Sequence, residues 1–182
     1  GSEITHKKRI PVFVTFHGAE PERISEFGKI ARLCADLIIT PSHNSARDLM
    51  TQGGVPESMV KVMGLGVQQK PRPPAEDVKK LRAELLDTEG KALIVTVARL
   101  AHQKAIDHLI LAAKQALKVN PALRFVVVGD GPQREQAQHW LAEAGVSDAV
   151  RFIGHSDNAP LYMAAADLFF LPSRWESLPI TI

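Results

Sequence analysis

Short, continuous apolar runs recur along this chain, and they constrain its fold more than any other feature. Apolar and polar residues do not alternate within them, so both faces of each predicted strand should be covered, as they are in a parallel sheet. We therefore expect strands of a parallel sheet near residues 11–15, 37–40, 92–97, 124–128, 150–153 and 168–171.

Helical patterns lie between these runs, because apolar residues at helical spacing share one face in several segments. Since strands and helices alternate, the chain is predicted to adopt an α/β fold, a Rossmann-like parallel sheet with flanking helices. The apolar faces are Ile24, Phe27, Ile30, Ala31 and Cys34; Ile106, Leu109, Ile110, Ala113 and Leu117; and Ala137, Trp140, Leu141 and Ala144, with Gly145 as the predicted C-cap of the last helix.

One segment breaks this alternation. Residues 64–76, GLGVQQKPRPPAE, hold two glycines, three prolines and few apolar side chains, which is typical of a linker. The sequence AEDVKKLRAELL, which overlaps its end, predicts a short amphipathic helix. We therefore predict two domains, residues 1–66 and residues 67–182, of which the first has too few strands for a complete Rossmann-like domain.

Composition argues against several classes of protein. The 182 residues, 45% of them hydrophobic, suffice for one ordinary domain or for parts of two. A net charge of +2 without any run of five Lys or Arg residues argues against nucleic acid as a partner. No stretch approaches the ~18 apolar residues of a membrane span, and no signal pattern opens the chain, so we expect a cytoplasmic protein.

The cysteine and the histidines give no sign of a redox or metal site. Cys34, the single cysteine, lies among apolar residues at helical spacing, so we expect a buried thiol in a reduced cytosolic protein. His102, His108, His139 and His155 lack the spacing of metal ligands, and we predict no metal site. The sequence also has no Gly-x-Ser-x-Gly motif of a nucleophile elbow.

Ligands of open parallel sheets bind beyond the carboxyl ends of the strands, so the residues there are the first candidates for a site. Arg99 and Lys104 follow the predicted strand 92–97 and lie five residues apart, just before a predicted helix. Two cations beside a helix N-terminus can bind phosphate oxygens through charge-assisted hydrogen bonds and backbone donors. The alternative is a pair of solvated surface cations.

Other strands end in glycine or histidine. Gly129-Asp130-Gly131 looks like the start of a dinucleotide fingerprint, but the pattern needs a glycine where Arg134 stands, so the fingerprint fails. The turn either brings the backbone close to a ligand or is purely structural. His17, which follows the first predicted strand, either donates to a ligand hydroxyl or caps a turn.

Taken in order, these motifs resemble one family, the retaining glycosyltransferases of the GT-B fold that form the large fourth, or group 1, family. The stretches VTVARLAHQKAIDHLILAA, FVVVGDGP and VRFIGHSDNAPLYMAAADLFFLPSRWESLP resemble its C-terminal, donor-binding domain. FVTFHG, ADLIITPSHNSARDLM and VKVMGLGV resemble the end of its N-terminal, acceptor-side domain and the crossover between the two. The resemblance implies a GT-B fold in which an incomplete N-terminal Rossmann-like domain precedes the donor domain.

By this resemblance the chain would bind a nucleotide-diphosphate sugar. Arg99 and Lys104 would bind the diphosphate and stabilise the charge that develops as the nucleotide leaves. Glu176 would hold sugar hydroxyls, and His17 would reach the donor sugar from the other domain. The remaining implied donor contacts are Gly129 and Gly131, the Gly154-His155 turn beside the base, and the backbone amides near Ser177 and Leu178 beside the phosphate or sugar.

The sequence departs from the family pattern at several places. Family members usually carry glycine where Ala105 follows the phosphate-binding lysine, a change that still permits close packing. The family's second glutamate, separated from Glu176 by seven residues, would fall just beyond Ile182, so we expect the donor site to be cut short. The stretch from Gly18 to Ala35 is short for the family and the glycine-rich acceptor-side loop is absent, so we expect this chain alone to bind donor weakly or not to react.

The leading hypothesis is an enzyme that transfers a sugar from a nucleotide-diphosphate donor to a glycan or lipid-linked acceptor, with retention at the anomeric carbon and without a metal or other cofactor. The resemblance also leaves open a peripheral association with the inner face of the membrane. Alternatives are a nucleotide-sugar 2-epimerase, which shares the GT-B architecture, and a non-catalytic nucleotide-sugar-binding fragment or scaffold subunit. The sequence specifies neither the base, the sugar nor the acceptor.

Overall fold

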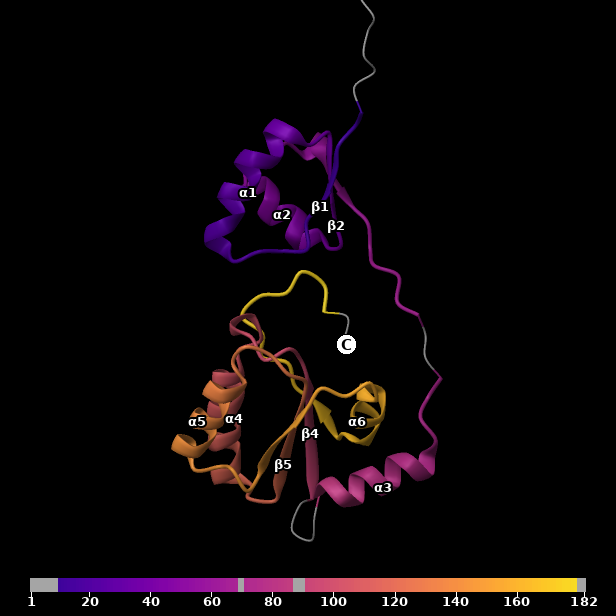
Figure 1. The fold of residues 1–182 in the computed structure, drawn as a ribbon, viewed down its shortest axis with the longest axis vertical. Coiled ribbons are helices and arrows are strands. Elements are labelled where there is room, and N and C mark those ends of the chain that lie inside the picture. Colours follow the sequence, from indigo (N-terminus) through magenta and orange to yellow (C-terminus); the bar gives the residue numbers. More distant parts are fainter. Residues whose placement is uncertain (1–9, 69–70, 87–90, 180–182) are drawn as a thin grey trace, which may run out of the picture. The chain divides into compact units, whose positions relative to one another are not determined.

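The computed structural model describes residues 10–68, 71–86 and 91–179. The chain forms two compact units, and both are α/β, as predicted (Figure 1). The first unit ends at Gln68 and takes in the segment that begins at Glu176, and the second ends at Trp175. The domain boundary expected from the sequence follows residue 66.

The first unit holds a three-stranded parallel sheet in the order β1-β2-β3. Its core comprises Phe16, Ile24, Ala31, Ile38 and Leu49, together with neighbouring buried residues. Its elements are β1 (Phe13–Thr15), α1 (Pro21–Cys34), β2 (Leu37–Thr40), α2 (His43–Thr51), the 3-10 turn η1 (Glu57–Met59) and β3 (Val60–Val62).

The expectation that Cys34 is buried was wrong, because its thiol is exposed and bonds only along the helix, to the carbonyl of Ile30 at 3.3 Å. The buried face of α1 is centred on Ile24, Gly28 and Ala31. A Cβ on Gly28 would lie 2.1 Å from the carbonyl oxygen of Gly53, so the helix packs there through its backbone. This close approach turns Ile30 and Cys34 toward solvent.

The second unit holds a four-stranded parallel sheet in the order β6-β5-β4-β7. Strands β4 and β5 lie at its centre and are buried over almost their full length, which explains their unbroken apolar sequences. The elements of this unit are α3 (Ala75–Leu86), β4 (Ala92–Val97), the 3-10 turn η2 (His102–Lys104), α4 (Ile106–Val119), β5 (Leu123–Val128), α5 (Arg134–Ala144), β6 (Val150–Gly154), α6 (Ala159–Ala165) and β7 (Leu168–Phe169).

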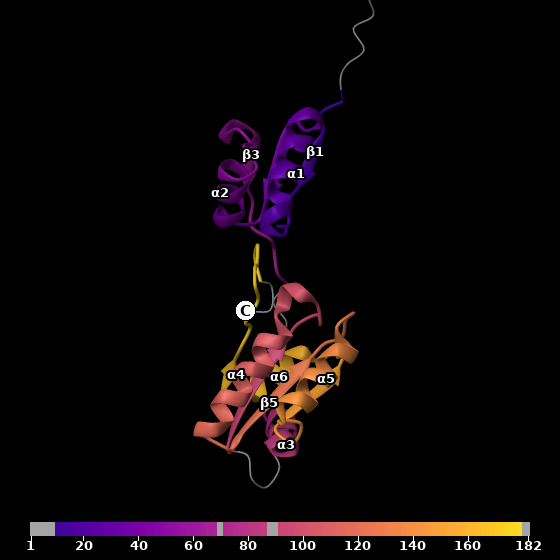
Figure 2. The same ribbon diagram turned by 90° about the vertical axis from the view of Figure 1, so that its left-hand side faces the viewer.

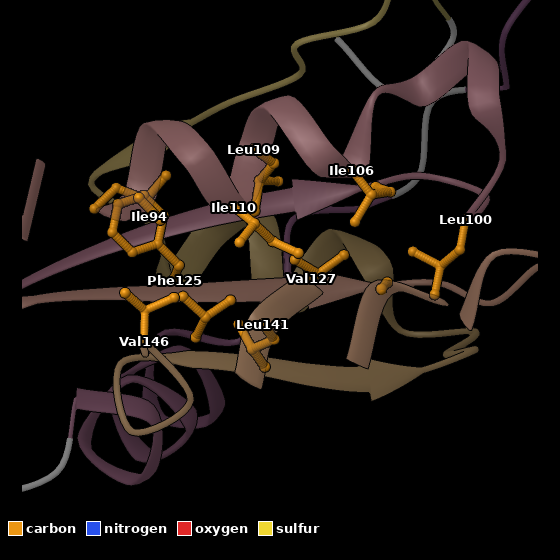
Figure 3. Packing of buried hydrophobic residues seen from close by; sticks show 12 residues of the cluster. Ile94, Leu100, Ile106, Leu109, Ile110, Phe125, Val127, Leu141 and Val146 are labelled. Carbon is orange, nitrogen blue, oxygen red and sulfur yellow. The ribbon is translucent and has the colours of Figure 1, made fainter. Parts of the chain in front are cut away.

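Helices cover both faces of this second sheet, α4 and α5 on one side and α3 and α6 on the other (Figures 1 and 2). Alternate residues of the central strands supply the two cores. Ile94, Phe125 and Val127 pack beneath α4 and α5, as Figure 3 shows together with Leu109 and Leu141. The opposite core consists of Leu85, Leu93, Val95, Val126, Val128 and Ala165.

An ion pair ties α3 to the sheet. The Asp167 carboxylate accepts a hydrogen bond from the backbone N–H of Leu93 at 2.7 Å and two from Arg82 at 2.8 and 3.0 Å. Arg82 also donates to the carbonyl of Ala165 at 2.7 Å. The hydrogen bond from the Leu93 N–H is the main cause that holds the pKa of Asp167 below its ordinary value, and the bonds from Arg82 act in the same direction.

Several elements differ from those that the sequence predicted. The predicted strands 11–15 and 168–171 shorten to β1 and β7, which are edge strands paired on one side only within the described residues. Helices α2 and α6 and strand β3 were not predicted. In the part of the chain that the structure describes, no helix is long and apolar enough to cross a membrane.

Candidate functional site

The segments that follow β4, β5 and β6 line one cavity of about 390 Å³ at the carboxyl end of the second sheet. Arg99 follows β4, Gly129 and Asp130 follow β5, and His155 and Ser156 follow β6. Parallel pairing of these three strands brings the segments together although they are far apart in sequence. Three of the residues predicted for the donor site, Arg99, Gly129 and His155, therefore share one cavity.

Backbone hydrogen bonds beyond the strand ends fix the floor of the cavity. The N–H of Ala98 donates to Val128 at 3.0 Å, and the N–H of Gly129 donates to Gly154 at 2.7 Å. Gly129 has φ +141°, and a Cβ there would lie 1.9 Å from the carbonyl oxygen of Ala98. Only glycine fits a position with this φ and this close approach.

Gly131 and Gly154 shape the same turns. A Cβ on Gly131 would lie 2.4 Å from the carbonyl oxygen of Leu100, so the turn after β5 packs directly on the turn after β4. Gly154 has φ +86° and lies beside the guanidinium of Arg134. Both glycines act through the backbone, and neither is among the residues that line the cavity.

The cation and the anion that line the cavity, Arg99 and Asp130, differ in whether they have a charged partner. Arg99 is exposed and makes no ion pair with any residue that the structure describes. Asp130 accepts a hydrogen bond from the N–H of Gly131 at 2.7 Å and pairs with Arg134 at 3.1 Å, so a nearby cation offsets its charge. The cavity therefore offers a cation and polar groups of His155 and Ser156 to a ligand.

Lys104 is the last residue of η2, and its backbone N–H donates to Ala101 at 2.9 Å. It is half-buried and is not among the residues that line the cavity. Ala105, which follows, is buried and left-handed, with φ 53° and ψ 51°, and α4 starts at the next residue. The cation predicted to act with Arg99 is thus held by a tightly turned backbone.

The other predicted residues belong to the first unit by their contacts. His17 is exposed just after β1, and Leu178 is 37% exposed. The Ser177 hydroxyl lies 2.7 Å from that of Ser45, near the N-terminus of α2. Glu176 immediately precedes Ser177, and the roles predicted for Glu176, His17, Ser177 and Leu178 stay predictions.

Sequence reasoning missed Asp130 and Ser156 as residues of the cavity. Both stand next to residues that it did select, Gly129 and His155, and both follow predicted strands. Their positions just beyond the carboxyl ends of predicted strands are the signal that could have identified them.

A second cavity and the search for a metal site add no further functional residues. A second cavity, of about 330 Å³, has an almost wholly apolar lining that includes Ala92, Leu123 and Phe125, and its one charged group, Asp167, is already bonded to Arg82. No group of three or more His, Cys, Asp and Glu side chains that could hold a metal occurs in the described parts of the chain.

Several known proteins with similar sequences or folds are glycosyltransferases. A family model described as "Glycosyl transferases group 1" matches residues 77–182. The 2-deoxystreptamine glucosyltransferase of Streptomyces kanamyceticus is 33% identical over 146 residues, which are 78% of this chain and 38% of that protein. The lipopolysaccharide core biosynthesis mannosyltransferase LpsB of Rhizobium meliloti is 26% identical over 95% of this chain and 49% of its own length.

Among solved structures, the Anabaena Alr3699/HepE complex with UDP-glucose superposes with a TM-score of 0.74 at 23% identity. The match covers 92% of this chain and 48% of that one. The chain therefore has the fold of GT-B enzymes and spans about half, or less, of the length of these relatives.

Proposed function

The chain belongs to the group 1 glycosyltransferases, and we propose that it binds a nucleotide-diphosphate sugar as the donor half of an enzyme that transfers the sugar to a saccharide or lipid-linked acceptor. The observation that carries the proposal is the cavity where Arg99, Gly129 and His155 meet. Relatives point the same way, because they include a glucosyltransferase and a mannosyltransferase, and a structural neighbour is a complex with UDP-glucose.

The lining of the cavity supports one orientation of the donor. The diphosphate lies at Arg99, where a guanidinium can bind two phosphate oxygens at once. The nucleoside lies toward His155 and Ser156, whose polar groups have local partners. His155 Nε2 lies 3.3 Å from the Asp157 carboxylate, and the Ser156 hydroxyl accepts from the N–H of Asn158 at 3.2 Å. Lys104, five residues beyond Arg99, supplies a second positive charge to the diphosphate.

In the reaction, negative charge grows on the diphosphate as the bond to the sugar breaks. Fixed cations that stabilise this charge lower the barrier more than they strengthen ground-state binding. The described residues include no evident nucleophile, so we propose transfer with retention through front-face departure, in which the leaving phosphate helps to deprotonate the acceptor. Arg99 and Lys104 would perform the charge stabilisation that a divalent cation supplies in other enzymes, and EDTA should leave donor binding unchanged.

Calorimetric titration tests the proposal on this chain. UDP, ADP and GDP are compared with uridine, adenosine and guanosine. We expect at least one nucleoside diphosphate to bind more tightly than its nucleoside, and Arg99→Ala to reduce that advantage by about tenfold, since a charge-assisted hydrogen bond is lost. Arg23→Ala, at an exposed arginine of α1, is the matched control and should bind like the wild type. Equal binding of each diphosphate and its nucleoside would refute the proposal.

Transfer itself needs a polypeptide that carries this sequence at the length of its relatives. Product analysis then separates the readings: a glycoside of unchanged anomeric configuration supports retaining transfer. Interconversion of the sugar without transfer would indicate an epimerase. Donor binding with no turnover would indicate a binding subunit.

A further inference from the structure

Arg174 connects two segments that carry, or lead into, residues predicted for the donor site. It follows β7, and its side chain is 22% exposed. Its guanidinium donates from Nη1 to the carbonyl of His102 at 2.8 Å and from Nη2 to the carboxylate of Asp107, with Nε2 of His108 at 3.5 Å. One side chain thus bonds both the turn η2 and the first turn of α4.

Further contacts join the same two segments. The backbone N–H of Arg174 donates to the carbonyl of Gln103 at 2.8 Å, and the Gln103 side chain donates back to the carbonyl of Trp175 at 3.0 Å. The rings of His102 and Trp175 lie 5.8 Å apart. Residues 102–103 and 174–175 are therefore held together by backbone, side-chain and ring contacts.

Each end of this network is one residue from a predicted donor ligand. Lys104 follows Gln103, and Glu176 follows Trp175. Regular structure does little to fix these segments, because β7 has only two residues and η2 is a single 3-10 turn. The bond with Arg174 is the first cause that lowers the pKa of Asp107, so the pair is ionised at neutral pH.

From this geometry we infer that Arg174 is a positioning residue of the donor site, with Asp107 and Gln103 as its partners. It holds the turn that carries Lys104 against the segment that leads into Glu176, and it does not itself bind the diphosphate. The inference rests on the proposed function, because it assigns Lys104 to the diphosphate of a nucleotide sugar.

The alternative is that Arg174 only stabilises the fold, as the Arg82–Asp167 pair does. A purely structural loss lowers the folded fraction and so weakens binding of a nucleoside diphosphate and its nucleoside equally. Loss of positioning weakens binding of the nucleoside diphosphate more than binding of the nucleoside. The ratio of the two affinities therefore separates the roles, and thermal unfolding measures stability alongside it.

The experiment uses whichever of UDP, ADP and GDP the wild-type chain binds most tightly, with its own nucleoside. Arg174→Met should lower the affinity ratio about tenfold, because a misplaced cation contributes little to a preorganised site. Asp107→Asn, which removes the partner charge, should lower it in the same direction. Arg82→Met is the matched control, and it should reduce stability while leaving the ratio unchanged.

Arg174→Lys distinguishes positioning from direct binding and also serves if Arg174→Met fails to fold. Lysine keeps the charge but cannot bond His102 and Asp107 through one planar fork. Positioning predicts that its ratio falls, whereas a direct charge contact predicts that the ratio is kept. If the wild type prefers the diphosphate and the affinity ratio is unchanged in both Arg174→Lys and Asp107→Asn, the inference is overturned. A wild type without that preference would instead overturn the proposed function.

Discussion

At the scale of single residues, Ala105 explains a departure from the family pattern. It is fully buried and left-handed, with φ 53°, at the position where the family usually has glycine. A left-handed alanine costs about 1–2 kcal/mol, and burial of its methyl group returns roughly 0.8 kcal/mol. From the sequence the substitution looked like a question of space, but the structure shows that it concerns backbone conformation.

Gly129 offers a sharper test of what glycine does at the site. We expect Gly129→Ala to destabilise the second unit by more than about 3 kcal/mol, because a real Cβ would force β4 and β5 apart in addition to the strain of a positive φ. Chemical denaturation measures the change.

Gly145→Ala is the control for that substitution. Gly145 also has a positive φ, +69°, but a Cβ there would have no heavy atom within 4 Å among those considered. The cost should be about 1 kcal/mol, from conformation alone. Equal costs at the two glycines would mean that the close approach to Ala98 does not matter.

How far the site could be predicted also depends on individual residues. The strand-end rule sufficed to select Arg99, Gly129 and His155, because the central strands have unmistakable apolar sequences. Arg174 was not predicted, since its partner Asp107 is 67 positions away and the two segments meet through the tertiary structure, which pairs β7 with β4. A contact of that kind leaves no local pattern in a single sequence.

At the scale of elements, length and burial decide what the sequence reveals. Helix α3 and the central strands β4 and β5 matched their predictions closely, because each is long or apolar enough to show a clear pattern. Helix α2 buries only Ser45, Ala46 and Leu49, too few apolar residues for a recognisable face. Strand β3 has three residues, with an exposed lysine between two valines, and resembles a loop in sequence.

The ion pair between Arg82 of α3 and Asp167 predicts that the stability of the fold falls in acid. Because the folded-state pKa of Asp167 is lowered, this carboxylate stabilises the fold above its ordinary value of 3.8, and that contribution is lost as the pH falls through the lower folded-state value. Asp107 shifts in the same direction, mainly through Arg174. The free energy of unfolding should therefore fall as the pH drops below 3.8.

Asp167→Asn tests this assignment. At neutral pH it should lower the free energy of unfolding by about 1 kcal/mol, since the pair with Arg82 is partly exposed. Its stability should then depend less on pH in the acid range than that of the wild type. Urea unfolding at a series of pH values supplies both numbers, and parallel acid profiles of the two proteins would remove Asp167 from the explanation.

At the scale of the whole molecule, the charges nearly cancel, with 22 Lys and Arg against 20 Asp and Glu. A net charge of +2 creates little long-range attraction for an anionic donor. Any strong effect of salt on donor binding must therefore arise locally, from cations at the cavity. Each unit has its own apolar core, so the donor cavity depends on the second sheet for its shape.

This balance of charge makes salt a probe of the site. Between about 10 mM and about 300 mM NaCl, the affinity for the preferred nucleoside diphosphate should fall several-fold, because the screening length shrinks from about 30 Å to below 10 Å. The affinity for the nucleoside should stay constant. Arg99→Ala should flatten the dependence, whereas Arg23→Ala, which removes the same charge from the molecule, should leave it unchanged. If both variants reduced the salt dependence equally, the overall charge of the protein rather than the cation at the cavity would govern binding. The proposal that Arg99 binds the diphosphate would then be wrong.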